Sequence, residues 1–328
     1  MTRRSPLRVP VSLAVASAAV VSLGGCMTVH GEREMIPAVS KGEAAKALKH
    51  YVTQYNAVNR TFDAKSDFSW ETGPLAEQDR AQTKINHAKY PDGPPHFVPM
   101  TLSNAHFTVP RQAGWPKFFV ADAISNYGNT PHWYLLFTRD DVKSPWKAAY
   151  LEGIAKNTPG PQFKTDADGY AQTVPRRPGD DAKVRTSPSD LAGTYTDYLT
   201  TQKGTDFAPG PATTGLLQSR RRLNSVPGQN LQWDDQASKF PPMALRTKNG
   251  GALVFFATDL HQKTTLPPTS MVNPAADAKA LLTNPAKKSN AIMLTKVTQQ
   301  MAMVPPKGSQ NRIQVLSHLP QLISATML

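Results

Sequence analysis

The sequence predicts an α+β protein of two tandem related modules, each with helices packed on a curved antiparallel sheet, after a signal peptide. Three observations support this prediction. A charge-free apolar run follows a basic N-terminus, two helical patterns precede a series of short aromatic strands, and the same order begins again after a Pro/Gly-rich segment. Consecutive strands with helices ahead of them favour an α+β layout over parallel βαβ units.

Residues 1–25 have the pattern of a bacterial export signal. Arg3, Arg4 and Arg8 give a basic head, and residues 9–25 carry no charge. The apolar part, residues 11–23, is shorter than the ~20 residues that a membrane-spanning helix needs. We therefore expect a signal peptide that is cleaved on export.

The residues around the single cysteine of the chain extend this prediction. Leu23, Gly24 and Gly25 directly precede Cys26. This order resembles the lipobox of bacterial lipoproteins. The resemblance implies that the Cys26 thiol takes a diacylglyceryl group and that cleavage makes Cys26 the first residue. Buried acyl methylenes contribute ~0.8 kcal/mol each, so the anchor would hold the protein on the outer face of the cell membrane. The alternative is an ordinary secretory signal that ends near a cysteine.

Composition gives the expected domain boundaries. Residues 26–39 are polar and irregular, and we interpret them as a tether. The first α+β module is expected at residues 40–156. Residues 157–186 are rich in Pro, Gly and charged residues, a composition typical of a linker. The second α+β module is expected at residues 187–328.

Two helices are predicted at the start of the first module. Ser40 and Glu43 match a capping box, in which Ser40 caps the helix and Glu43 reaches back to it. Apolar residues then recur at helical spacing as far as Tyr55. A second helix is expected from Pro74, or the next residue, to about Asn86, because Pro is well tolerated in a first helical turn.

Four short strands rich in aromatic residues follow these helices. They are predicted at residues 96–109, 117–126, 131–140 and 146–154. The Tyr-Gly-Asn-Thr-Pro segment at residues 127–131 predicts a hairpin connection between the middle two. We expect the helices to cover one face of this antiparallel sheet.

The pattern begins again beyond the linker. A helix capped near Ser187 or Ser189 is followed by a short basic helix and by an aromatic strand at residues 251–259. Repetition in order and type predicts a duplicated module. The alternative is chance similarity between two α+β domains.

Two family resemblances follow from these patterns. Two helices followed by a bent antiparallel sheet resemble the cystatin-like and nuclear-transport-factor-2-like cone folds. With its lipobox and its many Ala, Pro and Arg residues, the chain also resembles the uncharacterised lipoproteins of actinomycetes. Neither resemblance carries a catalytic residue over, because folds of this kind host enzymes, binding proteins and spacers.

Positive charge is concentrated in the C-terminal half. Residues 26–156 hold 15 Lys and Arg against 13 Asp and Glu, whereas residues 157–328 hold 19 against 11. Two basic clusters lie there, at Arg220, Arg221 and Arg222 and at Lys287 and Lys288. On an exported protein, this charge points to anionic lipid or a cell-wall polymer as partner, and not to nucleic acid. The alternative is a solvated surface with a bias of composition.

Chemical motifs are few. The sequence contains no Gly-rich phosphate loop, no Gly-x-Ser-x-Gly elbow and no His-Glu-x-x-His zinc motif, so no cofactor and no metal is predicted. The candidates for acid–base chemistry are His132 with Asp140, followed by their neighbours His96, His106, Asp122 and Asp141. The alternative for each histidine is a purely structural role.

Two functions from different classes remain. The favoured one is a membrane-anchored extracytoplasmic lipoprotein that acts as a non-catalytic binding or interaction protein. It would hold a partner in a sheet concavity or between the modules. The rival is a small-pocket enzyme of the hydrolase or isomerase kind that uses a His/Asp pair in the first module. A transporter's solute-binding subunit is disfavoured, because its domains need βαβ repeats.

Overall fold

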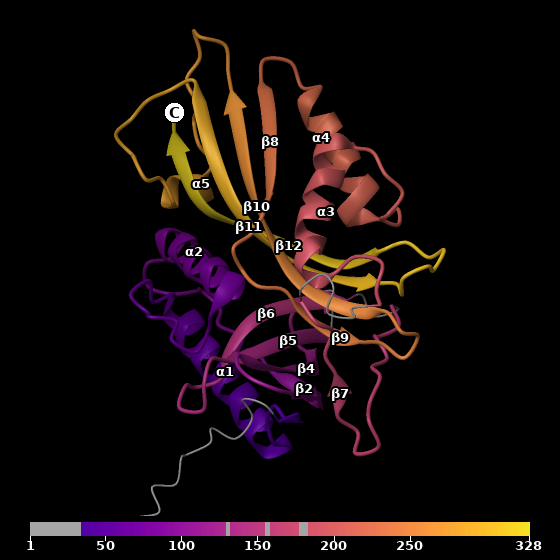
Figure 1. The fold of residues 1–328 in the computed structure, drawn as a ribbon. Helices are drawn as coiled ribbons and strands as arrows, with labels where there is room; N and C mark the ends of the chain where they lie inside the picture. Colours follow the sequence, from indigo (N-terminus) through magenta and orange to yellow (C-terminus); the bar gives the residue numbers. More distant parts are fainter. Residues whose placement is uncertain (1–33, 129–131, 155–157, 177–182) are drawn as a thin grey trace, which may run out of the picture. The chain divides into compact units, whose positions relative to one another are not determined.

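The fold comes from a computed structural model, drawn in Figure 1. The structure describes residues 34–128, 132–154, 158–176 and 183–328, which all belong to one compact unit. The predicted signal peptide, the predicted lipobox with Cys26 and most of the predicted tether lie outside these residues. So does the end of the predicted hairpin connection, at residues 129–131.

Helix α1 (Lys41–Thr61) begins where the capping pattern predicts. The Ser40 hydroxyl accepts a hydrogen bond from the Glu43 backbone N–H at 3.2 Å. The other half of the predicted capping box is wrong. The Glu43 carboxylate accepts hydrogen bonds from Arg139 at 2.9 Å and from the Trp146 indole at 3.0 Å, because the first sheet lies beside it. The helix ends at Phe62, which has a left-handed conformation.

Helix α2 (Gly73–Lys89) carries Pro74 in its first turn, as predicted, and extends beyond the expected end at Asn86. It contacts β6 of the first half and both β11 and β12 of the second half. Figure 1 shows it beside the last strands of both sheets. A helix assigned to the first module by sequence therefore also covers part of the second.

The first sheet is an antiparallel meander. Its order is β2-β4-β5-β6, made of β2 (Leu102–Thr108), β4 (Lys117–Ser125), β5 (His132–Arg139) and β6 (Lys147–Ile154). Three of the four predicted strands are confirmed within about one residue. The first begins later than predicted, because Pro99 lies near the start of that segment and proline cannot donate a hydrogen bond to a sheet. A small second sheet joins β1 (Ile36–Pro37), β3 (Pro110–Gln112) and β7 (Ala171–Gln172).

The second half repeats the order of helices before strands. Helices α3 (Pro188–Thr201) and α4 (Leu216–Asn224) are separated by a π-helical turn, η1 (Pro211–Gly215). The strands are β8 (Asn230–Ala237), β9 (Met243–Arg246), β10 (Ala252–Thr265), β11 (Ala291–Val304) and β12 (Gln314–Met327), with the short helix α5 (Ala276–Ala280) before β11. They form an antiparallel sheet of order β12-β11-β10-β8, and β9 also pairs with β10. Ser187 caps α3, as predicted.

The α+β class and the antiparallel sheets are thus confirmed, and each half keeps its own large sheet. The two halves nevertheless share a hydrophobic core. Val120 and Leu136 of the first sheet belong to the same buried cluster as Leu253, Phe255 and Met301 of the second. The tandem relation of the two halves and their domain boundaries stay predictions.

The predicted linker is more ordered than its composition suggests. Backbone hydrogen bonds join Lys164 to Arg246 and Val174 to Ala244, at 2.9 and 3.0 Å. Its two-residue strand β7 pairs in parallel with β3 of the first half. In its described residues, 158–176 and 183–186, the segment therefore connects the two halves.

Among the described residues, no helix is long and apolar enough to cross a membrane.

Candidate functional site

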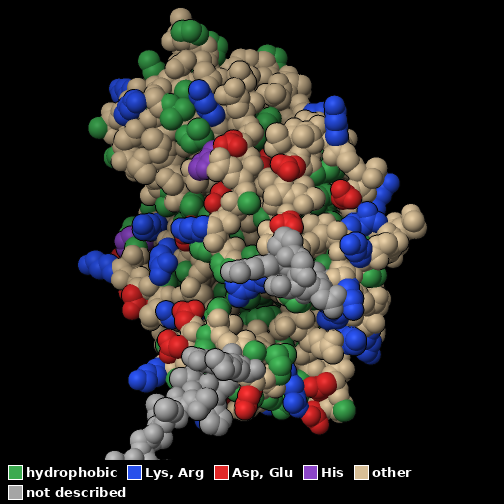
Figure 2. All heavy atoms as spheres, in the orientation of Figure 1, with side chains coloured by type: hydrophobic (Ala, Val, Ile, Leu, Met, Phe, Trp, Pro, Cys, Tyr) green, Lys and Arg blue, Asp and Glu red, His purple; other side chains and the backbone are tan. Residues whose placement is uncertain are grey.

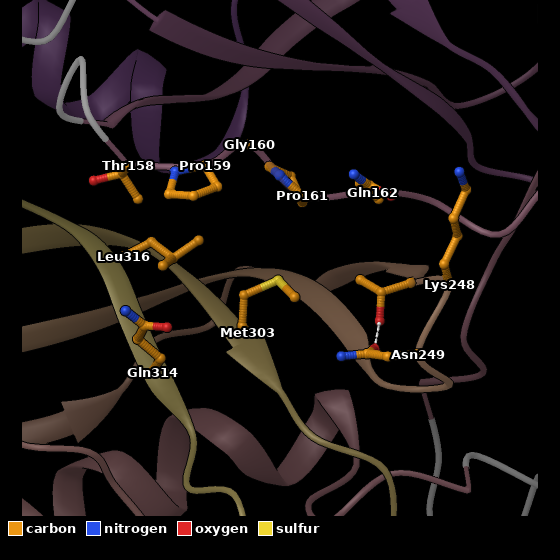
Figure 3. Close-up of a pocket in the computed structure, with 11 residues that line it drawn as sticks. Thr158, Pro159, Gly160, Pro161, Gln162, Lys248, Asn249, Met303, Gln314 and Leu316 are labelled. Carbon is orange, nitrogen blue, oxygen red and sulfur yellow. Dashed lines mark hydrogen bonds between the residues drawn. The ribbon is translucent and has the colours of Figure 1, made fainter.

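A groove of about 390 Å³ lies where three parts of the chain meet (Figure 3). One wall is residues 158–162. The opposite wall is formed by Met303 of β11 with Gln314 and Leu316 of β12, and residues 247–249 lie at one end. This volume is within the range of ligand pockets in proteins, about 300–1,000 Å³.

The first wall is an irregular segment held by its backbone. The Lys248 N–H donates to the Gln162 carbonyl at 2.9 Å, and Phe163 forms a β-bridge with Thr247. Pro159 and Pro161 have no N–H to donate, so the segment cannot continue as a regular strand. Residues 158–162 therefore pair with no strand and border the open space of the groove.

Gly160 brings this wall against the first sheet. A Cβ at this position would lie 2.8 Å from the Tyr134 hydroxyl oxygen. Tyr134 is only 3% exposed, so its ring has little room to move away. Glycine is therefore needed here for close approach, and the groove forms at the junction of the two halves.

The turn at the end of the groove is fixed by Asn249. Its side-chain oxygen accepts hydrogen bonds from the Thr247 hydroxyl at 2.6 Å and from the Gly251 N–H at 3.2 Å. Gly250 completes the turn with a φ of +85°. The neighbouring Lys248 is the one ionisable side chain among the described residues that line the groove. The groove therefore offers a single positive charge beside an apolar surface.

A β-bulge in β12 shapes the opposite wall. Met301 pairs with Ser317 and Ala302 pairs with Val315, which leaves Leu316 as the extra residue. Bulges redirect side chains within a strand. Here Leu316 lines the groove, while Ser317 lies close to the buried Glu152 of the first sheet.

A row of polar side chains crosses the first sheet near this wall. Asp122, Tyr134 and Glu152 are directly paired on β4, β5 and β6, so they share one face. Glu152 is fully buried, and neither of its carboxylate oxygens accepts a hydrogen bond from the described residues. Burial raises the pKa of Glu152 to about 8. The pKa of Tyr134 is also raised, by burial and then by the charge of Asp122.

The predicted acid–base pair is not assembled. His132 is the first residue of β5 and Asp140 follows its last, so the strand separates them by roughly 25 Å. The closest acidic partner of His132 is Asp122, with 3.6 Å between Nδ1 and Oδ1. Asp140 instead lines a different pocket, of about 270 Å³, with Tyr150.

Of the other candidates, His106 lies near this contact, whereas His96 and Asp141 lie elsewhere. His106 is paired with Asp122 in the sheet but is exposed, and His96 is exposed in the segment before β2. Asp141 caps its own loop by accepting the Ser144 hydroxyl and backbone N–H, and these bonds lower its pKa. Across the described residues, the structure shows no group of three or more His, Cys, Asp or Glu that could hold a metal ion.

The comparisons with known proteins give a family. The model of a family described as "Domain of unknown function (DUF8094)" matches residues 35–325. The chain belongs to this family. A Streptomyces coelicolor protein named uncharacterized lipoprotein is 40% identical over 321 residues, 95% of this chain and 94% of its own. A Streptomyces avermitilis protein with the same name is 37% identical over 321 residues, 96% of this chain and 94% of its own.

These relatives agree with the resemblance to actinomycete lipoproteins. No solved structure matches the chain. The resemblance to the cystatin-like and nuclear-transport-factor-2-like folds therefore stays a prediction for this family.

The structure does not join the two basic clusters into one surface. Arg220 of α4 forms a bidentate ion pair with Asp235 of β8, and both side chains are largely buried, at 11% and 6% exposure. Arg221 and Arg222 are exposed beside β8, whereas the loop of Lys287 and Lys288 follows a segment paired with β12. The strands β8 and β12 are opposite edges of the second sheet. On the face drawn in Figure 2, Lys and Arg side chains lie among Asp and Glu.

Sequence reasoning missed the groove itself. Its first wall lies in the segment that composition assigns to a linker, and its other walls come from residues about 90 to 150 positions away. A signal was present in Pro159-Gly160-Pro161, which predicts an irregular backbone. That pattern does not reveal which side chains face it.

Proposed function

We propose that the chain is a lipid-anchored extracytoplasmic protein that binds its partner non-catalytically in the groove between residues 158–162 and strands β11 and β12. The observation that carries the proposal is the groove's lining. It combines apolar Pro, Met and Leu side chains with amides and the single charge of Lys248. Such a lining suits recognition, since a few placed polar groups in an apolar pocket fix a ligand's orientation.

The anchor is supported by the lipobox pattern at Leu23, Gly24 and Gly25 and by the names of the two relatives, both called lipoproteins. We expect mass spectrometry of the membrane fraction to find a mature chain that begins at Cys26 and carries diacylglyceryl. Cys26→Ser should leave the chain unprocessed. An unmodified Cys26, or a Cys26→Ser protein that is still processed and membrane-bound, would contradict this part of the proposal.

The groove favours a ligand with both an anionic group and an apolar or backbone-like part. Lys248 supplies the charge, and the C-terminal half that contains it has an excess of eight basic residues, 19 against 11. Basic proteins attract anionic ligands over distances set by the ionic strength. We therefore propose a phosphate-bearing cell-wall polymer as the partner.

The test uses the full-length lipoprotein in detergent with glycerol-phosphate oligomers as the probe. Lys248→Met should weaken binding about fivefold, which corresponds to the ~1 kcal/mol that one basic group contributes near an anionic surface. Lys279→Met, in the exposed helix α5, is the matched control and should bind like the wild type. Binding should also weaken as salt is raised.

Two outcomes would contradict the assignment of the groove as the binding site. Equal loss in both lysine variants would assign the effect to overall charge. Binding to phosphatidylglycerol vesicles that matches binding to the oligomers, with Lys248→Met unchanged, would assign it to a membrane surface elsewhere on the chain.

The second candidate remains a small-pocket enzyme, and the contact of His132 with Asp122 favours it. Both side chains are partly exposed, at 39% and 31%, so a substrate could reach them. In this case His132→Ala would abolish a measured turnover while circular dichroism and melting stay unchanged. The groove offers no such pair, because its described lining contains no carboxylate and no histidine.

A further inference from the structure

A second, smaller cavity of about 30 Å³ lies between α1 and α2, and it is lined by oxygen-bearing side chains. The oxygens come from Tyr55 and Asn59 of α1, Glu71 just before α2, and Asp79, Gln82 and Thr83 of α2, and the rest of the lining is Val58, Phe68 and Trp70. A cavity of this size holds about one water-sized particle. It contacts no residue of the groove.

This cavity contains two carboxylates, those of Glu71 and Asp79. Glu71 is 3% exposed, and neither of its oxygens accepts a hydrogen bond from the described residues. Burial, followed by the nearby Asp79, raises the pKa of Glu71 well above its usual range, and burial raises that of Asp79 to about 6. Buried charges are stable only when they are paired, protonated or bound to a metal.

No described basic residue forms an ion pair with either carboxylate. Arg80 is the nearest cation named among the groups that act on Glu71, but it donates to the Asp67 carbonyl at 2.9 Å and lies over the Phe68 ring. Asp166, by contrast, has a basic partner, because Arg111 lies 2.9 Å from its carboxylate. Glu71, which is buried, and Asp79, which is partly buried, are therefore close together without a counter-charge from the described residues.

The neutral side chains around the pair can direct oxygen atoms into the cavity. The Asn59 amide nitrogen donates to the Tyr55 carbonyl at 2.9 Å, and that of Gln82 donates to Asn86 at 2.8 Å. In both side chains the amide nitrogen therefore donates a hydrogen bond within its own helix. The amide oxygen is left to line the cavity. The Thr83 hydroxyl is buried in the same lining.

We propose that this cavity binds a hard divalent cation, Ca²⁺, through Glu71 and Asp79 with neutral oxygens from Asn59, Gln82 and Thr83. Two carboxylates, two amide carbonyls and a hydroxyl can reach the six to eight oxygens that Ca²⁺ prefers when carboxylates bind through both oxygens. Mg²⁺ suits the site less, because it keeps several waters and the cavity is small. With only two charges, the site should bind Ca²⁺ at about 10⁻⁴–10⁻³ M, as extracellular modules do.

The experiment uses the full-length chain in detergent and Tb³⁺ as a luminescent substitute for Ca²⁺. Trp70 lines the cavity, so excitation of tryptophan should sensitise bound Tb³⁺. We expect Ca²⁺ to displace Tb³⁺ at millimolar concentration and Mg²⁺ to displace it at least tenfold less well. Glu71→Gln and Asp79→Asn should each weaken Tb³⁺ binding at least tenfold. Trp70→Phe should reduce the luminescence while Ca²⁺ still raises the melting temperature.

Glu77→Gln is the matched control, since Glu77 lies on α2 but pairs with the exposed Lys239. It should bind Tb³⁺ like the wild type. Circular dichroism checks that each variant is folded. We expect Glu71→Gln to stay folded, because the substitution removes a buried ionisable group. The proposal is overturned if Glu71→Gln and Glu77→Gln bind Tb³⁺ equally. It is also overturned if acid stabilises the wild type through Glu71 and Asp79 while Ca²⁺ leaves its melting temperature unchanged, because the pair then shares only a proton.

Discussion

The two faces of the first sheet are both buried, but against different parts of the chain. On one face, Phe119 and Phe137 stack at 4.9 Å and pack against α1 of the same half. On the other face, Val120 and Leu136 pack against strands of the second half, including Phe255 of β10. The first face is a local structure, whereas the second exists only when both halves are present. A module with such a second face is not expected to be stable by itself.

The largest expected effect tests this shared face. Phe255→Ala removes a fully buried ring between the sheets and should cost about 3–5 kcal/mol of unfolding free energy. Four of the five tryptophans lie in the first half, so in a Trp233→Phe background fluorescence reports on that half alone. We expect Phe255→Ala to shift this urea-unfolding transition, because the halves unfold together.

The exposed Leu223 provides the control, since Leu223→Ala should change the transition by less than about 0.5 kcal/mol. A first-half transition that stays in place in Phe255→Ala, while circular dichroism detects a second transition at lower urea, would mean two independent modules. That result would restore the sequence-based domain boundaries.

The next effect concerns Glu152, the charged group on the shared face. Its folded-state pKa of about 8 lies above that of an unfolded glutamate, about 4.3, so the folded chain keeps a proton that the unfolded chain releases. Stability should therefore fall as the pH rises between about 4 and 8, by at most ~1.4 kcal/mol per pH unit from this group. Glu152→Gln should remove this part of the slope.

Urea titrations of Glu152→Gln and the wild type at a series of pH values measure the difference. Glu77→Gln, at a partly exposed position of α2, is the control and should keep the wild-type slope. The unfolding free energies of the two glutamate variants and the wild type could instead change with pH in the same way. In that case Glu152 is ionised in the folded state and its environment differs from the one described.

A smaller effect should follow from the polar contact beside this face. The Gln78 amide of α2 donates to the Val297 and Leu319 carbonyls at 2.9 and 2.8 Å and accepts from Gln299 at 2.6 Å. Gln299 also accepts the Leu151 N–H of the first sheet at 3.0 Å. Gln299→Leu leaves buried groups unpaired and should cost about 1–3 kcal/mol.

A double-mutant cycle with Gln78→Leu measures the coupling of the two amides. We expect the double variant to lose less than the sum of the single losses, because the amides act as one network across the halves. Strictly additive losses would mean that the two glutamines stabilise their own halves independently.

The smallest expected effect tests the wall of the groove. Gly160→Ala places a methyl group 2.8 Å from the Tyr134 hydroxyl and should cost about 1 kcal/mol by overpacking. Tyr134→Phe removes that hydroxyl, so the cost of Gly160→Ala should fall in its presence. An unchanged cost, measured by thermal melting of the four proteins, would mean that the wall can move away from the first sheet.

Local patterns predicted much of the first half. Ser40 and Pro74 fix the starts of α1 and α2, because capping and proline geometry depend on only a few neighbouring residues. The aromatic runs gave β4, β5 and β6 within about one residue. The long strands β11 and β12 were not predicted, because their many polar residues lie in a sheet that is only partly covered.

The sequence alone therefore determined the element types, the order of helices before strands and the charge asymmetry, and it predicts the lipobox at Cys26. Only the tertiary structure decided that His132 and Asp140 lie apart, that Arg220 is taken by Asp235, and that Glu71 meets Asp79. The physical reason is the range of the forces involved. Capping and periodicity act over one or two turns, whereas a groove, an ion pair or a carboxylate pair depends on strands and helices that are distant in sequence and meet only in the packed core.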